Sequence, residues 1–395
     1  MKKLMIIGAS TFQLPAYIEA HKQGIHTIAI SNIETDEAKK IASKSYNLST
    51  LDKEKILEVA KIEGINGVMT IASEIATPTV SYIAEKLNLP GYSSMAVNTI
   101  SNKYKLREYL KENNFSHINF GIARTLDEAN SIFQSLNKPV IIKPTTASGS
   151  RGVFKLYKES ELKKYFQTSI DSSFLDKSVI IEEFMNGTEV GGEVLINNGE
   201  IVFLQVTKKY VTSTFVPYGH ILPCDINKKT RIAIKDLLQN IIASIGLKNG
   251  PLNFDIMVDE DVPKIIELGA RLGGNCLPIL MRKHTNINTI ESVIKLALGE
   301  TLDNLSNCDA IPMAAYILHS NKKGILNNNV KESILSSDLN KYVDKVHISK
   351  SIGDEIESFT KGSNQIGYVI LKADSQSEII KKFDEFHSKS WIEIN

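Results

Sequence analysis

The first hundred residues alternate short apolar runs with stretches whose apolar residues recur at helical spacing. Such runs are typical of buried strands, and such stretches are typical of amphipathic helices. Strands that alternate with helices favour a parallel sheet with right-handed crossovers, so we expect a Rossmann-like domain here. The predicted strands are 4–8, 27–30 and 67–71, and the predicted helices are 14–23, 52–63 and 78–87, with Gly24 and Gly64 ending the first two helices.

Beyond residue 100 the pattern predicts helices, hairpins and a second α/β stretch. Ser101 is the expected cap of a helix over 101–113, and Thr125 with Glu128 forms a capping box at the start of another helix. The turn residues 197–199 predict a hairpin over 193–208. The remaining predicted strands are 140–144, 179–184, 253–258, 264–268, 314–318, 366–372 and 391–394, and the remaining predicted helices are 228–245 and 377–387.

Composition narrows the class of protein. The chain has 395 residues, of which 42% are hydrophobic and 23% charged, so we expect two or three folded domains rather than disorder. A net charge of +1 gives no electrostatic case for binding nucleic acid or an anionic membrane. No apolar run reaches the roughly 18–20 residues of a membrane span, and the apolar stretch after the basic start is too short for a signal peptide. We therefore expect a soluble, cytoplasmic protein.

Two further kinds of site are disfavoured. Cys224, Cys276 and Cys308 are odd in number and far apart, so neither a disulfide framework nor a zinc site is supported. Gly8 is not followed by the remaining glycines of the G-x-G-x-x-G pattern. An oxidoreductase with a nicotinamide cofactor is therefore a weak alternative.

Lys143 lies at the end of a predicted buried strand and precedes a loop of small residues. A lysine on one side and free backbone N–H groups on the other suit a phosphate group. The loop has almost no side-chain bulk, so its main chain can approach an anion closely. A solvated turn remains the alternative interpretation. The loop residues proposed for phosphate are Ser148, Gly149, Ser150 and Gly152.

A second candidate segment follows the strand 179–184. A strand that leaves its sheet with free main-chain groups can bind the edge of an adenine, and Phe184 and Met185 offer apolar contact. Glu189 can accept hydrogen bonds from both ribose hydroxyls. An edge strand with solvated Glu182 and Glu183 is the alternative.

The third element is a pair of acids. Asp255 and Glu267 lie on two strands joined by a tight acidic turn, so they can sit side by side across a hairpin. Neighbouring like charges are unfavourable without a cation, and Mg²⁺ is commonly held by a pair of carboxylates and nucleotide phosphates. Arg271 then follows in a glycine-rich segment and suits a phosphoryl group or a carboxylate. The alternative is that the acids merely face water.

Taken in chain order after Lys103, these three elements resemble the ATP-grasp superfamily. Within it, the chain is similar to the carboxylate–amine ligases related to carbamoyl-phosphate synthase and bacterial L-amino acid ligases. The resemblance implies a Rossmann-like domain at 1–100, an ATP-grasp small lobe with a linker helix at 101–185, a large lobe with the metal site at 186–308, and a C-terminal α/β subdomain at 309–395. It also implies ATP and Mg²⁺ as cofactors, with Mn²⁺ as a substitute, and small-molecule carboxylate and amine substrates. Relatives of this type are often homodimers.

Carried over by position, the resemblance assigns roles to residues. Lys103 and Lys143 would bind ATP phosphates under the 148–152 loop, Glu182 and residues 183–185 would meet the adenine, and Glu189 the ribose. Asp255 and Glu267 would bind Mg²⁺. Arg271 would stabilise the transferred phosphoryl group. Gly269 departs from the pattern, because many relatives have Asn at that position. The candidates for substrate contact are Glu74, Glu193, His220 and Arg271, with His220 also a candidate base.

The expected reaction is phosphorylation of a carboxylate by ATP and attack of an amine on the acyl phosphate. A ribonucleotide carboxylase of purine synthesis is the alternative from the same superfamily. It typically has Pro-Arg-Pro-His after the metal carboxylate, where this chain has residues 270–273 as Ala-Arg-Leu-Gly. A binding module that senses ATP without chemistry is the alternative from another class, and it would not need both metal acids.

Overall fold

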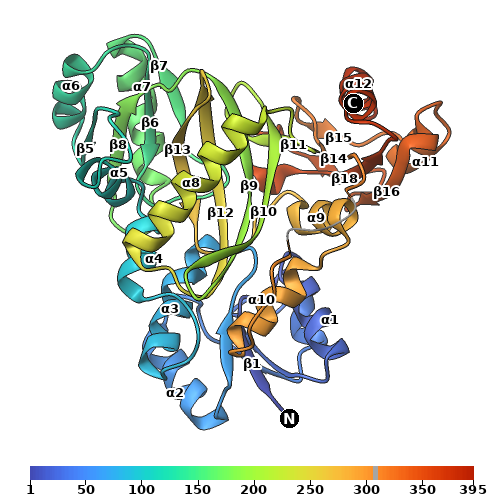
Figure 1. Cartoon of the computed structure of the whole chain (residues 1–395). Helices are drawn as coiled ribbons and strands as arrows, with labels where there is room; N and C mark the ends of the chain where they lie inside the picture. The colour runs from blue at the N-terminus through green and yellow to red at the C-terminus, as the bar shows by residue number, and fades with distance from the viewer. Residues whose placement is uncertain (306–309) are drawn as a thin grey trace.

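The computed structural model describes residues 1–305 and 310–395. Four parallel strands in the order β3-β2-β1-β4 form the N-terminal sheet, and helices flank it (Figure 1, blue). The Rossmann-like sheet predicted for this region is therefore confirmed. Its strands are β1 (Lys3–Ile7), β2 (His26–Ile30), β3 (Lys44–Tyr46) and β4 (Gly67–Met69), and its helices are α1 (Leu14–Lys22), α2 (Lys53–Glu63) and α3 (Thr77–Lys86).

Both ends of α2 are set by residues that lie next to the helix in the sequence. The Asp52 side chain accepts a hydrogen bond from Lys55 N, and Gly64 ends the helix in the left-handed region with φ of 61°.

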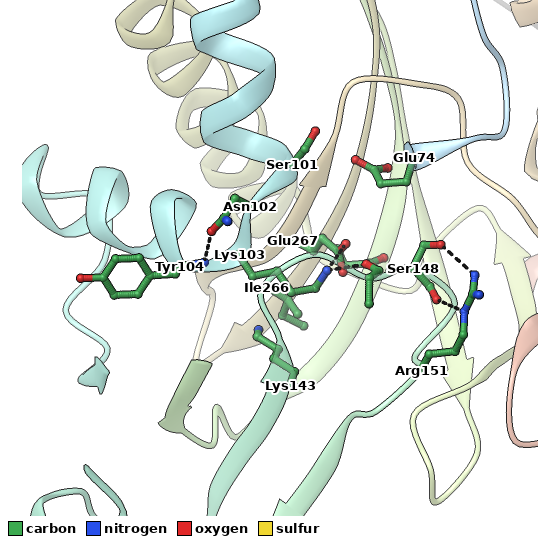
Figure 2. Close-up of polar contacts among 12 residues, drawn as sticks. Glu74, Ser101, Asn102, Lys103, Tyr104, Lys143, Ser148, Arg151, Ile266 and Glu267 are labelled. Carbon is green, nitrogen blue, oxygen red and sulfur yellow. Dashed lines mark hydrogen bonds and ion pairs between the residues drawn. The ribbon is translucent and has the colours of Figure 1, made fainter. Parts of the chain in front are cut away.

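The linker helix differs from the expectation. The structure has two helices, α4 (Ser94–Ser101) and α5 (Lys103–Glu112), instead of one helix over 101–113. Asn102, not Ser101, caps α5, since its Oδ1 accepts from the backbone N–H groups of Tyr104 and Lys105 at 3.0 and 3.1 Å (Figure 2). The prediction for Ser101 was wrong because that residue ends the preceding helix, and the extended backbone of Asn102 separates the two.

A small antiparallel sheet follows, in the order β5-β8-β6-β7. The predicted capping box is confirmed, because Thr125 accepts from Glu128 N and the Glu128 carboxylate accepts from Thr125 N. Apolar residues of α6 and α7 pack with the strands into one core. The elements are β5 (Phe120–Ala123), α6 (Leu126–Ser135), β6 (Val140–Pro144), β7 (Phe154–Leu156), α7 (Glu159–Asp171) and β8 (Val179–Glu183).

An eight-stranded sheet in the order β13-β12-β9-β10-β11-β14-β18-β16 forms the centre of the molecule (Figure 1). Helix α8 (Lys228–Ile245) packs on one face, where Val194, Val206 and Phe254 share a core with Ile241. Along the strands these apolar residues alternate with polar ones that point to the opposite face. The first five strands are β9 (Thr188–Asn197), β10 (Glu200–Val211), β11 (Pro217–Leu222), β12 (Gly250–Asp259) and β13 (Val262–Gly269).

Three of the C-terminal strands, β14, β16 and β18, continue this central sheet, and β15 and β17 pair in a separate sheet of two strands. The predicted boundary at 308/309, and Cys308 with it, lie outside the described residues. Helices α9 and α10 precede these strands, and α10 packs against α1. The elements are α9 (Leu277–Thr285), α10 (Thr289–Ala297), β14 (Met313–Leu318), β15 (Gly324–Ile325), α11 (Val330–Leu335), β16 (Val343–Ile348), β17 (Glu355–Ile356), β18 (Gly367–Lys372) and α12 (Gln376–Ser388).

The predicted last strand at 391–394 was wrong. Ile394 forms a single bridge with Leu326 and no strand. Trp391 instead stacks on Phe386 and donates its indole N–H to the Phe386 carbonyl at 2.8 Å. The apolar residue that suggested a strand is thus used to pack the chain end against α12. No helix within residues 1–305 and 310–395 has the length and apolar character needed to cross a membrane.

Candidate active site

Two adjoining cavities lie between the small sheet, the polar face of the central sheet and the N-terminal domain. One has a volume of about 120 Å³ and is lined by β6, β8 and the segment 183–185. The other has a volume of about 480 Å³ and reaches Glu74 and the C-terminal segment 361–365. Both are lined by Ser148, Lys209, Asp255 and Glu267, so these residues stand at the junction of one continuous cleft.

Lys103 is held at this junction by two acceptors. Its Nζ donates to the Ala147 carbonyl at 2.8 Å and to Glu267 Oε1 at 2.9 Å, and only 8% of its side chain is exposed. Figure 2 shows the lysine reaching Glu267 from the start of α5. Lys103 therefore connects the small-residue loop with the proposed metal strand.

Lys143 lies in a cluster of buried charges. Its Nζ donates to Glu182 Oε1 at 2.5 Å, and Glu182 is also paired with Arg107 at 2.6 Å. Burial and the neighbouring cations Arg107 and Lys103 lower the pKa of Lys143, although Glu182 opposes this. Burial alone would raise the pKa of Glu182, but Arg107 and Lys143 bring it to about 2. Glu182 is thus paired with two cations, and Lys103 lies close to Lys143, so the positive charge in this cluster favours the approach of an anion such as a phosphate.

The predicted adenine segment lines the smaller cavity, but fewer of its backbone N–H groups are free than we expected. Glu183 N donates to the Asn119 carbonyl and Phe184 N to the Pro139 carbonyl, at 3.1 and 3.0 Å. The Glu183 carboxylate is bound by Asn119 and Asn137. Among the described residues Met185 N has no acceptor, so it is the free backbone N–H group of the segment 183–185.

Lys209 was missed in the sequence. Its ammonium lies 2.7 Å from both Glu189 and Asp255, and its side chain is 6% exposed. The predicted hairpin stopped at residue 208, but continued alternation along β10 places Lys209 on the same face as Thr207. The predicted ribose and metal acids are thus joined by a buried cation.

Asp255 and Glu267 are direct partners in the register of β12 and β13, as the hairpin predicted. Burial raises the pKa of Asp255, and Lys209 opposes this while Glu189 adds to it. Burial alone would raise the pKa of Glu267, but Lys103 and other cations lower it.

The donor set suits magnesium that is shared with a ligand. No group of three or more His, Cys, Asp or Glu side chains arranged for a metal occurs within the described ranges. Two carboxylates suit Mg²⁺ when phosphate and water oxygens complete its coordination, so the residues present fit a nucleotide-bound ion. At Gly269, where the resemblance led us to expect Asn, a Cβ would lie 3.0 Å from Glu74 Oε2.

Hydrogen bonds hold the small-residue loop both to itself and to the segment at Phe215. Arg151 donates back to Ser148, with Nε 3.0 Å from the carbonyl oxygen (Figure 2). Ser150 Oγ donates to the Phe215 carbonyl at 2.6 Å. Ser148, Gly149 and Ser150 line both cavities. Gly152 lines neither, and a Cβ there would come within 3.0 Å of Ser172 and Pro144. Its role in the loop is therefore steric.

Glu74 and Arg271 form an ion pair in the lining of the larger cavity. Arg271 Nε lies 2.8 Å from Glu74 Oε2, but the angles do not form a hydrogen bond. Among the described residues neither Glu74 carboxylate oxygen has a hydrogen-bond donor. Arg271 is therefore the charge partner of Glu74, and a ligand ammonium would compete with it for the carboxylate.

His220 lines the same cavity but is buried on β11. Thr207 Oγ1 lies 3.0 Å from the Gly191 carbonyl and 2.9 Å from His220 Nδ1. The Thr207 hydroxyl has one hydrogen and the carbonyl can only accept, so His220 Nδ1 is the donor and Nε2 keeps its lone pair. Burial and Lys209 lower the pKa of His220 to about 3. His220 is thus a neutral acceptor at pH 7.

Glu193 lies beneath the glycine-rich segment and lines neither cavity. Its Oε1 accepts from Gly273 N at 2.7 Å, and among the described residues Oε2 has no partner. Burial raises its pKa to about 8. Glu193 thus supports the loop that presents Arg271, and its contact with a substrate stays a prediction.

We predict that Glu193→Gln stabilises the protein in a pH-dependent way. A carboxyl group with a raised pKa binds its proton more tightly in the folded chain, so stability falls as pH rises from about 4.5 to about 8. Glutamine removes this penalty, which is on the order of 3 kcal/mol at pH 7–8 and below about 1 kcal/mol at pH 5. Thermal unfolding of both proteins across this range, with the exposed Glu200→Gln as control, measures the difference. A difference that does not change with pH would contradict the prediction.

Residues 136–279 match the family model of the ATP-grasp domain. Two sequence relatives are an uncharacterized protein, y4rH, from Sinorhizobium fredii and the carbamoyl phosphate synthase large chain of Pseudothermotoga lettingae. The first is 27% identical over 65% of this chain and 54% of its own length, and the second 24% identical over 77% and 29%. The chain thus spans about half or less of the length of these relatives.

The L-amino acid ligase of Bacillus licheniformis has the same fold throughout. The TM-score is 0.84 at 22% identity, and the match covers 100% of this chain and 98% of that one. The chain therefore carries an ATP-grasp domain, as its sequence indicated. Its similarity is to ATP-grasp enzymes of the carboxylate–amine ligase type.

Proposed function

We propose that the protein is an ATP-dependent ligase that joins a small-molecule carboxylate to an amine and forms ADP and phosphate. One observation carries the proposal. Asp255 and Glu267 face each other in register at the junction of the two cavities, and each is held by a buried lysine. This arrangement puts the proposed metal ligands between the cavity with the adenine segment and the cavity with Glu74 and Arg271.

The cofactors in this proposal are ATP and Mg²⁺. A protein of the same fold, the biotin carboxylase domain of a Hydrogenobacter thermophilus carboxylase, has been solved with MgADP, with a TM-score of 0.75 at 16% identity. In this chain, phosphate oxygens would be bound by Lys103, Lys143 and Lys209. The backbone N–H of Met185 would bind the adenine edge, and Glu189 would bind the ribose. Magnesium would neutralise charge on the transferring phosphoryl group when it is bound.

The chemistry needs two transfers. A carboxylate oxygen of the first substrate attacks the terminal phosphorus of ATP, the bond to ADP breaks, and an acyl phosphate forms. The amine nitrogen then attacks the acyl carbon, phosphate leaves, and the nitrogen loses a proton. The chain would contribute position and charge neutralisation, which phosphoryl transfer chiefly requires.

A phosphate-release assay with amino acids, supplied singly and in pairs, tests the proposal. We expect release of ADP and phosphate that depends on Mg²⁺ and exceeds the background at least about tenfold only when a carboxylate and an amine are both present. Release with bicarbonate and a ribonucleotide, but with no amino acid pair, would indicate the carboxylase alternative. Nucleotide binding without release under any pairing would indicate the sensor alternative.

A further inference from the structure

We propose that Arg107 is the positioning residue that joins the nucleotide side of the cleft to its metal side. The inference rests on the proposed function, because it assigns Arg107 a task in placing Lys143 and Glu267. Arg107 does not line either cavity, so it acts through these residues and not on a ligand.

Arg107 is a buried arginine at the meeting point of the two lobes. It lies on the linker helix α5 and is 1% exposed. Its Nε donates to Glu182 Oε2 at 2.6 Å, on β8 of the small sheet. Its Nη1 and Nη2 donate to the carbonyls of Ile265 and Ile266, on β13 of the central sheet, at 2.5 and 3.2 Å.

These two carbonyls mark a break in the β12–β13 ladder. Asp255 pairs with Glu267, but the next residue, Ile256, pairs with Ile265, so Ile266 is an extra residue on β13. A β-bulge of this kind disrupts the ladder and re-aims the side chains beside it. The extra residue sets the register that brings Glu267 opposite Asp255. Arg107 supplies hydrogen bonds at that bulge and so stabilises the direction of Glu267.

On the other side, Arg107 determines how strongly Glu182 holds Lys143. Glu182 is shared between two cations, with Arg107 Nε at 2.6 Å and Lys143 Nζ at 2.5 Å. Without Arg107 the carboxylate would be neutralised by Lys143 alone. Lys143 would then be less available to a phosphate group.

The fork geometry of the guanidinium explains why this position needs arginine. Arg107 reaches both oxygens of Glu182 and two successive carbonyls, which requires several donors in one plane. A lysine keeps the charge but is a point donor. Lys103, one turn earlier on α5, donates to Glu267 itself, so both lobes are tied to the same helix.

The test is calorimetric titration of ADP, with and without Mg²⁺, into the wild type, Arg107→Lys and the control Lys111→Met. We expect Arg107→Lys to raise the Kd of ADP and, separately, the Mg²⁺ concentration for half-maximal binding enhancement, each by about tenfold. Lys111 is exposed near the end of α5, and its variant should match the wild type. A folded Arg107→Lys with both values unchanged overturns the proposal.

A second variant keeps the test decisive if Arg107→Lys does not fold. Arg107→Gln removes the guanidinium fork but leaves Glu182 compensated by Lys143, so no buried carboxylate is left without a partner. The Kd of ADP should again rise about tenfold, and the Mg²⁺ enhancement should fall about tenfold. An unchanged Mg²⁺ enhancement overturns the proposal. A wild type that binds no Mg²⁺–ADP would instead contradict the proposed function, and this inference with it.

Discussion

Glu267→Gln is expected to lower turnover by about 10³-fold while the fold is retained. The substitution keeps the shape of the side chain, and the amide oxygen can still accept the hydrogen bond from Lys103. It removes one of the two negative charges that face each other across β12 and β13. A divalent ion bound there would then be held by one negatively charged side chain instead of two, at the proposed point of phosphoryl transfer.

The measurement is phosphate release at saturating ATP over a range of Mg²⁺ concentrations, with thermal unfolding to confirm folding. Glu260→Gln is the matched control, because Glu260 lies in the exposed turn of the same hairpin. We expect the control to keep wild-type turnover within about twofold. Normal turnover in Glu267→Gln would show that the metal assignment is wrong.

Lys209→Met is expected to lower kcat/KM for ATP by about 10²–10³-fold. Lys209 is a buried cation between Glu189 and Asp255, at 2.7 Å from each. Without it, two nearby carboxylates repel each other, and the pKa of Asp255, already raised by burial, rises further. The variant should also lose stability, by about 3–5 kcal/mol, as buried pairs do when one partner is removed.

Lys208→Met is the control for this prediction, because residue 208 is adjacent on β10 but points to the opposite face. Steady-state kinetics and circular dichroism on both variants separate loss of function from loss of fold. Lys209→Arg keeps a buried charge and should recover folding without full activity. Equal kinetics in the 208 and 209 variants would contradict a role for Lys209 in the cleft.

Local patterns were enough to predict most of the strands and helices and one pairing between adjacent strands. The hairpin of β12 and β13 is short and its turn is acidic, so the pairing of Asp255 with Glu267 could be read from the sequence. The end of α2 followed from Gly64, which lies in the left-handed region. These predictions succeeded because the deciding interactions join residues close in sequence.

Contacts between distant segments account for what was missed. Arg107 is paired with Glu182, which lies 75 positions further along the chain, and no local pattern predicts that pair. A signal was present, since Lys103, Leu106, Arg107 and Leu110 share one buried face of α5, but it indicates burial and not a partner. The bulge at Ile266 carries no glycine, so nothing in the sequence marked it. The contact of Glu193 with Gly273 N joins residues that are 80 positions apart, so the sequence did not indicate it and we assigned Glu193 to the substrate.

The wall of the larger cavity comes from two separate parts of the chain. Asp255, Glu267 and Arg271 lie within the ATP-grasp match, whereas Lys361, Ser363 and Gln365 come from a segment well after it. That segment approaches the phosphate loop, with Gly362 N 3.9 Å from where a Cβ on Gly149 would stand. A substitution within residues 361–365 would therefore reshape the rim of the larger cavity and leave the strands that carry Asp255 and Glu267 intact. In the proposed ligase, this segment is thus the part of the cleft at which selectivity is open to redesign.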